Sequence, residues 1–204
     1  MKAHLRLTAV FLIVVSFTML TGFASYLAQP QTTLKVTPQT LKVKVGEETT
    51  IDLAVEKVSE LYGAQLHIRF DPEVLEVIDA DPAQEGIQIE PGTLPVPDFV
   101  VQNAADNQNG TIDYALTQLP PSEPGEGDGV VARVTFRAKK AAVSQIQFDQ
   151  FLLADTKGGS IEAVPQHGQI RVMGSSTWMF VAIAGVAVAL LVGGSLGFVI
   201  TKGK

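Results

Sequence analysis

The sequence predicts an all-β protein, a β-sandwich built from residues 34–173. Apolar and polar residues alternate with a period of two in one short run after another, as half-buried strands require. Turn-forming dipeptides separate these runs at short intervals, and the segment between the two apolar ends of the chain has no long helical periodicity. Each such strand has one apolar face to bury, which two stacked sheets achieve; an open barrel is the alternative.

Eight runs carry the alternation, and within each run the apolar residues share one parity. In chain order they are Leu34–Val36, Leu41–Val45, Ile51–Val55, Ala64–Phe70, Ile112–Leu116, Val134–Ala138, Ile146–Phe148 and Ile170–Val172. The segment Pro72–Ile78 is expected to form at most a short turn or strand. Asn109-Gly110 favours a two-residue hairpin turn, because both residues tolerate positive φ. Leu119–Gly127 is too rich in proline and glycine for a strand, so a loop is expected there.

Residues 1–24 have the features of an export signal. Lys2 and Arg6 precede the apolar run Leu7–Leu20, and small residues at Gly22 and Ala24 suit signal peptidase, so cleavage is expected after Ala24. Residues 25–33 then form a polar leader. Alternatively, the apolar run stays uncleaved as a second spanning helix; either way, the middle of the chain lies outside the membrane.

Residues 178–200 predict one transmembrane helix near the C-terminus. About 23 residues without a charge are long enough to cross a hydrocarbon core of about 30 Å. Trp178 suits the outer headgroup layer, and Lys202 and Lys204 in the tail 201–204 suit the cytoplasmic side. Residues 174–177 form a short flexible linker. The sequence therefore predicts a single-pass cell-membrane protein with an extracytoplasmic domain and a cytoplasmic C-terminus.

Composition excludes several classes of function. The 21 acidic residues outnumber the 15 basic ones, and the net charge of −6 argues against binding to nucleic acid or to anionic lipid. The chain has no cysteine, so an exported domain must be held together by its core, without disulfides or a thiolate metal site. Roughly 145 residues remain between the apolar ends, enough for one domain with its own core.

The residues offer little for catalysis or for a metal. His67 and His167 are the imidazoles of the mature chain, and no nucleophile motif accompanies either. Aligning Gly110 with the glycine of an EF-hand loop places Ala105 at the first ligand position, where Asp is required. A turn is therefore expected over Asp106–Gly110. The sequence predicts no enzyme activity, no cofactor and no metal site.

Several stretches then follow one another in a recognisable order. They are Val45-Gly46-Glu47 with the run Ile51–Val55, Tyr62–Val77 with its Asp71-Pro72-Glu73-Val74-Leu75 turn, Asn109-Gly110-Thr111-Ile112, Gly127–Ala138, and His167–Val172. In this order they resemble the bacterial cohesin family, receptor modules that bind dockerins in cellulosomes and related surface complexes. The resemblance covers nearly all of Leu34–Val172. The segment Gly86–Asp98 departs from it and matches no part of the family's pattern.

The resemblance implies a cohesin-like jelly-roll β-sandwich of about nine strands, related in fold to family 2 and 3 carbohydrate-binding modules. It also implies a dockerin partner that docks on one sheet face. Parity turns the polar residues of two strands outward, and in cohesins the corresponding strands lie in the dockerin-binding sheet. The resulting candidates are Gln65, His67, Arg69, Asp113, Ala115 and Thr117, with Phe99 and Val101 at the border. Arg69 is the strongest candidate, because arginine is enriched among residues that dominate binding energy. An ordinary solvated face is the alternative.

Together these features predict a membrane-anchored, non-catalytic cohesin-like module that recruits dockerin-bearing proteins. One alternative is a module that binds polysaccharide directly. A row of exposed aromatic rings, the usual sign of such a module, is not apparent, because most rings take inward parities and the single tryptophan, Trp178, belongs to the membrane segment. A structural cell-envelope protein without a discrete ligand is the other alternative.

Overall fold

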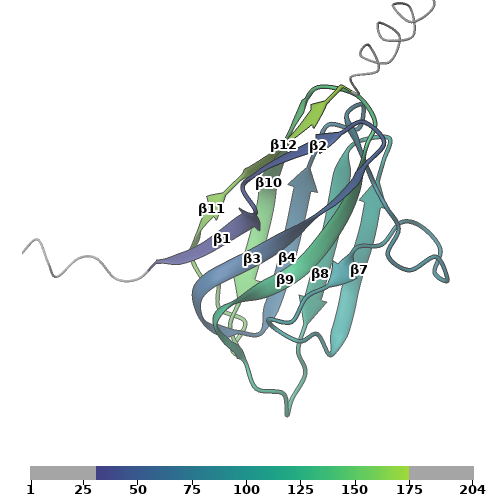
Figure 1. The fold of residues 1–204 in the computed structure, drawn as a ribbon. Helices are drawn as coiled ribbons and strands as arrows, with labels where there is room; N and C mark the ends of the chain where they lie inside the picture. The colour runs from purple at the N-terminus through teal and green to yellow at the C-terminus, as the bar shows by residue number, and fades with distance from the viewer. Residues whose placement is uncertain (1–30, 175–204) are drawn as a thin grey trace, which may run out of the picture.

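The computed structural model describes residues 31–174, which form two six-stranded sheets packed face to face (Figure 1). The first sheet runs in the order β11 (Ala163–Gln166), β1 (Thr32–Thr37), β3 (Glu48–Leu61), β9 (Gly125–Ala138) and β5 (Leu75–Val77), with β6 (Glu90–Pro91) also paired to β9. The second sheet runs in the order β2 (Thr40–Lys44), β12 (Gly168–Met173), β10 (Val143–Ala154), β4 (Gly63–Arg69), β8 (Thr111–Thr117) and β7 (Phe99–Asp106). The predicted β-sandwich is confirmed.

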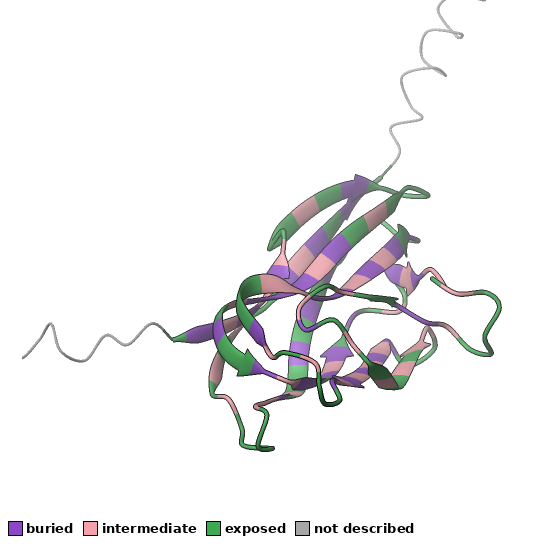
Figure 2. Ribbon diagram, turned by 90° about the horizontal axis from the view of Figure 1, so that it is seen from below, coloured by how far each residue is buried: buried purple, intermediate pink, exposed green. Residues whose placement is uncertain are grey.

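The core lies between the two sheets and is built by the alternation seen in the sequence. On β4 and β8 every inward residue is at most 5% exposed, and Tyr114 and Phe136 are the largest fully buried side chains. Figure 2 shows the pattern as purple bands that alternate with pink and green along the strands. Each buried aliphatic or aromatic side chain stabilises the fold by about 1.5–3 kcal/mol. Without disulfides, this single core holds the two sheets together.

The described residues contain twelve strands rather than about nine, and the differences have local causes. The sequence missed β7, because this edge strand lacks alternation: Val100 and Val101 are consecutive, and a bulge lies between Val100 and Gln102. It also missed the short strands β6 and β11, whereas β5 lies within Pro72–Ile78, where a short turn or strand was expected. The expected loop at 119–127 is wrong at its end, since β9 already begins at Gly125 and pairs with Leu61.

The expected two-residue hairpin at Asn109-Gly110 is wrong. The connection between β7 and β8 is a four-residue turn over residues 107–110, because Asp106 Oδ1 accepts hydrogen bonds from the N–H groups of Gln108 (2.7 Å) and Asn109 (2.9 Å). Gly110 has φ +71°, and a Cβ there would lie 2.3 Å from the carbonyl oxygen of Phe70. Only glycine fits this position.

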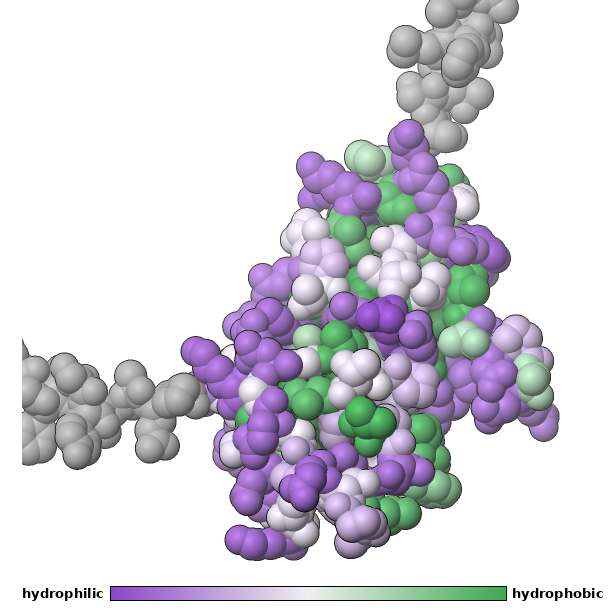
Figure 3. Space-filling view, turned by 60° about the horizontal axis from the view of Figure 1, so that its bottom comes forward, coloured by the Kyte–Doolittle hydropathy of each residue, from purple (hydrophilic) through white to green (hydrophobic). Residues whose placement is uncertain are grey.

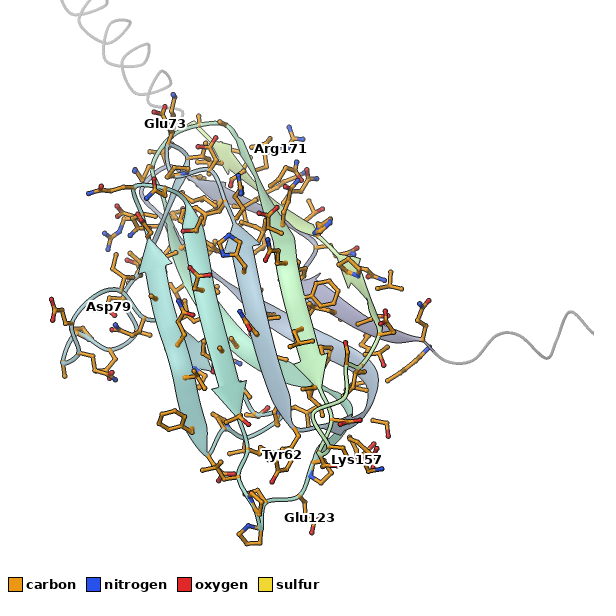
Figure 4. The ribbon with its side chains drawn as sticks, turned by 180° about the vertical axis from the view of Figure 1, so that it is seen from behind. Tyr62, Glu73, Asp79, Glu123, Lys157 and Arg171 are labelled. Atoms are coloured by element: carbon orange, nitrogen blue, oxygen red, sulfur yellow. The ribbon has the colours of Figure 1, made fainter. Side chains whose placement is uncertain are left out.

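The segment between β5 and β7 is tied to the second sheet by two asparagine side chains. Asn107 accepts from the N–H of Val77 (2.7 Å) and donates to its carbonyl (2.9 Å). Asn103 does the same with Ile89, both at 2.8 Å. Between these two clamps the chain forms a loop that projects past β7, with Asp79 at its base (Figures 1 and 4).

The two ends of the sandwich are distinct. Figure 4 places Glu73 and Arg171 at one end, and Tyr62, Glu123 and Lys157 at the other. The last strand, β12, ends at the Glu73 end, where the N–H of Val45 donates to the carbonyl of Met173. The expected export signal with its cleavage site at Ala24, the membrane helix 178–200 and the tail lie outside the described residues. Residues 31–174 include no helix long and apolar enough to cross a membrane.

Candidate binding face

Four strands of the second sheet, β10, β4, β8 and β7, bring their outward side chains into one plane, which we call the binding face (Figure 4). Their register sets these side chains in rows across the strands. The row nearest the Glu123 end is Ala154, Gly63, Thr117 and Phe99; the next is Leu152, Gln65, Ala115 and Gln102; the third is Gln150, His67, Asp113 and Ala104; and the fourth is Gln147, Arg69, Thr111 and Asp106. The rows change from small and apolar at one end to charged at the other.

The six β4 and β8 candidates proposed from the sequence lie on this face, together with Phe99 at its border. Gln65, Arg69 and Phe99 are exposed, whereas His67, Asp113, Ala115 and Thr117 are half-buried. Parity predicted the β4 and β8 members, because their neighbours Leu66, Ile68, Ile112, Tyr114 and Leu116 all point into the core. Val101, expected at the border, is 61% exposed at the bulge of β7.

A polar network crosses three strands at the centre of the face. His67 Nδ1 lies 2.6 Å from Asp113 Oδ1, and Arg69 Nη2 donates to Asp149 Oδ2 at 2.8 Å. His67 Nε2 faces the same Asp149 oxygen at 3.9 Å. Asp149 was missed by the sequence reasoning, because a bulge between Phe148 and Gln150 inserts it into β10 and shifts the parity of the strand. The sequence shows Asp149 within the alternating run of β10, but it does not show how β10 pairs with β4.

A shallow depression of about 180 Å³ lies beside this network. Its walls come from β4 and β10 and are formed by Gln65, His67, Gln150, Phe151 and Leu152. Leu152 is 46% exposed, so an apolar side chain and two amides border the hollow together with the imidazole. Such a depression accepts a single side chain from a partner and does not enclose a small molecule.

At the Glu123 end, the face continues into exposed apolar residues. Phe99 is 57% exposed, and Val96 and Leu119 lie on the neighbouring loops at 64% and 52%. Asp98 joins these loops: its Oδ2 accepts from the N–H of Leu119 (2.8 Å), and the hydrogen bonds from Ser122 and Leu119 lower the pKa of its carboxyl. Figure 3 shows apolar side chains reaching the surface at this end of the sandwich.

His167 and Asp106, the other residues considered for catalysis or metal binding, make hydrogen bonds that support the fold. His167 Nδ1 accepts from the N–H of Phe148 (3.2 Å) and lies apart from the network of His67. The carboxylate of Asp106 caps the turn at 107–110, as described above, and the predicted turn is confirmed. Residues 31–174 contain no cluster of three or more His, Asp or Glu side chains arranged to hold a metal ion. The arrangement on the binding face favours contact with another protein.

Comparison with known proteins agrees with this architecture. Residues 34–172 match the family model for the cohesin domain. A curated relative, cell surface glycoprotein 1 of Acetivibrio thermocellus, is 30% identical over 123 residues, which cover 53% of this chain and 5% of that protein. The chain therefore spans only about a twentieth of the length of this relative.

Solved structures share the fold. The chain resembles a type II cohesin domain from the cellulosome of Acetivibrio cellulolyticus (TM-score 0.59, 21% identity, 69% of this chain and 95% of that one). It also resembles a non-cellulosomal cohesin from Archaeoglobus fulgidus (TM-score 0.57, 17% identity, 74% and 96%). A third similar structure comes from a type I cohesin–dockerin complex of Clostridium thermocellum (TM-score 0.56, 20% identity, 72% and 99%). Since the family match covers most of the chain and the sandwich has the fold of solved cohesins, the chain belongs to the cohesin domain family.

Proposed function

We propose that this chain recruits a dockerin-bearing protein through its binding face and holds that protein at the outer side of the cell membrane. The observation that carries the proposal is the four-strand face itself. It combines a partly exposed polar network, the small residues Gly63 and Ala115, and an exposed apolar border at Phe99. Several similar solved cohesins belong to complexes with dockerins, of type I in Clostridium thermocellum and of type II in Acetivibrio cellulolyticus.

The chemistry of the face suits a folded partner. Charged groups arranged on one face give a protein interface its specificity through electrostatic complementarity, and the small residues beside them let another surface approach closely. Direct binding to polysaccharide is less well supported. Within residues 31–174, Phe99 is the one aromatic ring that is mainly exposed, so the face does not present a row of rings for sugar stacking.

The proposed anchor is the apolar segment 178–200, which follows closely after β12. Because β12 ends at the Glu73 end, an anchor there places that end of the sandwich next to the membrane and the Glu123 end away from it. The binding face then runs along the side of the domain, so a partner approaches parallel to the membrane surface.

The decisive experiment is a titration of the purified chain, in detergent micelles, with the dockerin modules of the source organism. We expect one-to-one binding in isothermal titration calorimetry with a dissociation constant below about 1 μM, equivalent to −8 kcal/mol. If every dockerin fails to bind at micromolar concentration, the proposed partner is wrong. Fractionation of cells that express the full chain or a version ending at residue 177 tests the anchor separately; equal release of both versions from the membrane would contradict it.

A further inference from the structure

The imidazole of His67 lies between two carboxylates contributed by different strands. Asp113 on β8 lies 2.6 Å from Nδ1, and Asp149, in the bulge of β10, lies 3.9 Å from Nε2. On its own strand the next charged group is Arg69, which pairs with Asp149 at 2.8 Å. The other neighbours that share the depression, Gln65, Gln150, Phe151 and Leu152, carry no charge. These three charged groups therefore set the electrostatics around the ring.

The short contact fixes the tautomer of the neutral ring. An ionised carboxylate only accepts hydrogen bonds, so the 2.6 Å contact with Asp113 requires the proton to be on Nδ1. Nε2 is then a bare acceptor. It faces the oxygen of Asp149, which is also an acceptor, across a 3.9 Å gap that is too long for a hydrogen bond. Two acceptors therefore face each other beside the depression. The Asp149 oxygen accepts from Arg69 on its other side, whereas Nε2 has no donor.

We propose that a basic side chain of the bound partner donates into this gap, and that a proton on His67 Nε2 competes with it, so that acidification weakens binding. The inference rests on the proposed function and specifies the partner's chemistry and the regulation of the same face. A partner ammonium or guanidinium group reaches both Nε2 and Asp149, next to the apolar wall at Leu152. A proton on Nε2 supplies the missing donor from within and repels that cation.

Protonation of His67 also changes the net charge of the network in a way that weakens its attraction for a basic group. With a neutral ring, the network of Asp113, Asp149, Arg69 and His67 has a net charge of −1, and it becomes neutral when the ring takes up a proton. Imidazole is the side chain that ordinarily changes charge between pH 5 and 8. Protonation of the ring removes the excess negative charge of the face and the open acceptor at Nε2 together, and with them both attractions for a basic group.

One test needs no partner: nuclear magnetic resonance of the full chain in micelles. At pH 7.5 we expect His67 to carry its proton on Nδ1. As the pH falls to 5.5, a proton should appear on Nε2, and the signals of Asp149 and Gln150 should shift with the same midpoint. The inference is overturned if the proton lies on Nε2 at pH 7.5, or if the Asp149 signals do not follow the ring.

The second test measures affinity for a dockerin identified in the calorimetric titration, at pH 7.5 and at pH 5.5. We expect about tenfold weaker binding at pH 5.5, because one competing proton changes affinity by at most tenfold per pH unit. His67→Gln still donates to Asp113 but takes up no proton, so its pH effect should fall below about twofold. His167→Gln is the matched control and should retain the full effect. An equal pH effect in His67→Gln overturns the inference while leaving the proposed function intact, whereas failure of every dockerin at both pH values refutes the proposed function.

Discussion

The two outer faces of the sandwich differ in how completely they satisfy their own charges. On the first sheet, Arg133 pairs with Asp52 on β3 (2.8 Å) and with Glu90 on β6 (3.1 Å). Arg137 pairs with Glu48 on β3 (2.7 Å) and with Glu76 on β5 (2.9 Å). These acceptors raise the pKa of both guanidinium groups. Further cross-strand contacts on this sheet join Lys35 to Glu56 and Thr50 to Thr135.

The binding face on the second sheet is organised differently. It has a polar network in which Asp149 accepts from Arg69, whereas Nε2 of the neutral His67 ring faces the same oxygen at 3.9 Å and has no donor. The rows beside it contain Gly63, which has no side chain, and Ala115 and Thr117, whose side chains are short, so they leave room for another surface. A face whose ions are already paired with one another gains little from a partner, whereas an incompletely paired face gains hydrogen bonds on binding. The contrast therefore supports the proposal that the partner binds to the second sheet.

The largest expected effect is from Ala115→Arg, which places a long cation in the middle of the binding face. We expect dockerin binding to weaken at least about thirtyfold, equivalent to about 2 kcal/mol at the centre of an interface. Thr50→Arg adds the same side chain to the first sheet and should leave the affinity within twofold. Calorimetric titration of both variants decides the matter; similar losses in the two would mean that the faces are not functionally distinct.

Arg69→Glu is expected to have the next largest effect. It removes an exposed arginine, the residue type most often found among those that dominate binding energy, and we expect about tenfold weaker binding with the fold intact. The counterpart Arg137→Glu on the first sheet should lower the melting temperature by a few degrees without changing affinity, because it opposes two carboxylates far from the partner. Calorimetry and thermal unfolding, measured by circular dichroism, test the pair; unchanged affinity in Arg69→Glu would remove Arg69 from the interface.

Between the faces, Tyr114→Phe should stabilise the protein. Tyr114 is 0% exposed, its hydroxyl has no hydrogen-bond partner within residues 31–174, and burial raises its pKa to about 12. Removing the hydroxyl should raise the free energy of unfolding by about 1 kcal/mol at pH 8. The raised pKa means that the hydroxyl ionises more readily in the unfolded chain than in the fold. The un-ionised Tyr114 therefore makes its full contribution to the free energy of unfolding below pH 10, and this contribution is lost as the pH rises towards 12. Urea unfolding at pH 8 and pH 11 should show the gain of the variant increasing with pH, and a destabilised variant would contradict this.

The smallest expected effect concerns the turn at the charged end of the binding face. Hydrogen bonds from Asn109 and Gln108 lower the pKa of Asp106, so they stabilise the turn above about pH 4 and are lost as the pH falls through the lowered pKa. Hydrogen exchange at the amides of Gln108 and Asn109 should therefore accelerate specifically in acid. In Asp106→Asn this acceleration of exchange in acid should disappear, while the melting temperature of the variant stays within about a degree of the original protein. If exchange at these amides still accelerates in acid in the variant, another carboxylate is responsible.

The sequence predicted the sandwich and which side chains of β4 and β8 share one outward face, because period-two alternation on these strands determines which side chains point inward. It could not predict the partners of those side chains. The contacts of His67 depend on the register of β4 against β8 and on the bulge that inserts Asp149, and neither is encoded in the alternation of a single strand. Likewise β7, with its consecutive Val100 and Val101, has no pattern that distinguishes an edge strand from a loop.

The position of β12 has a mechanical consequence. This strand ends at Met173 and lies between β2, to which it runs parallel, and β10, to which it runs antiparallel. A pull on the chain beyond Met173, resisted by a protein held on β4 and β8, acts along the strand axis. The backbone hydrogen bonds lie across that axis, so the load is shared by both flanking ladders at once and does not open them one pair at a time. The domain is thereby built to resist tension between its C-terminal end and a protein bound to the binding face of the same sheet.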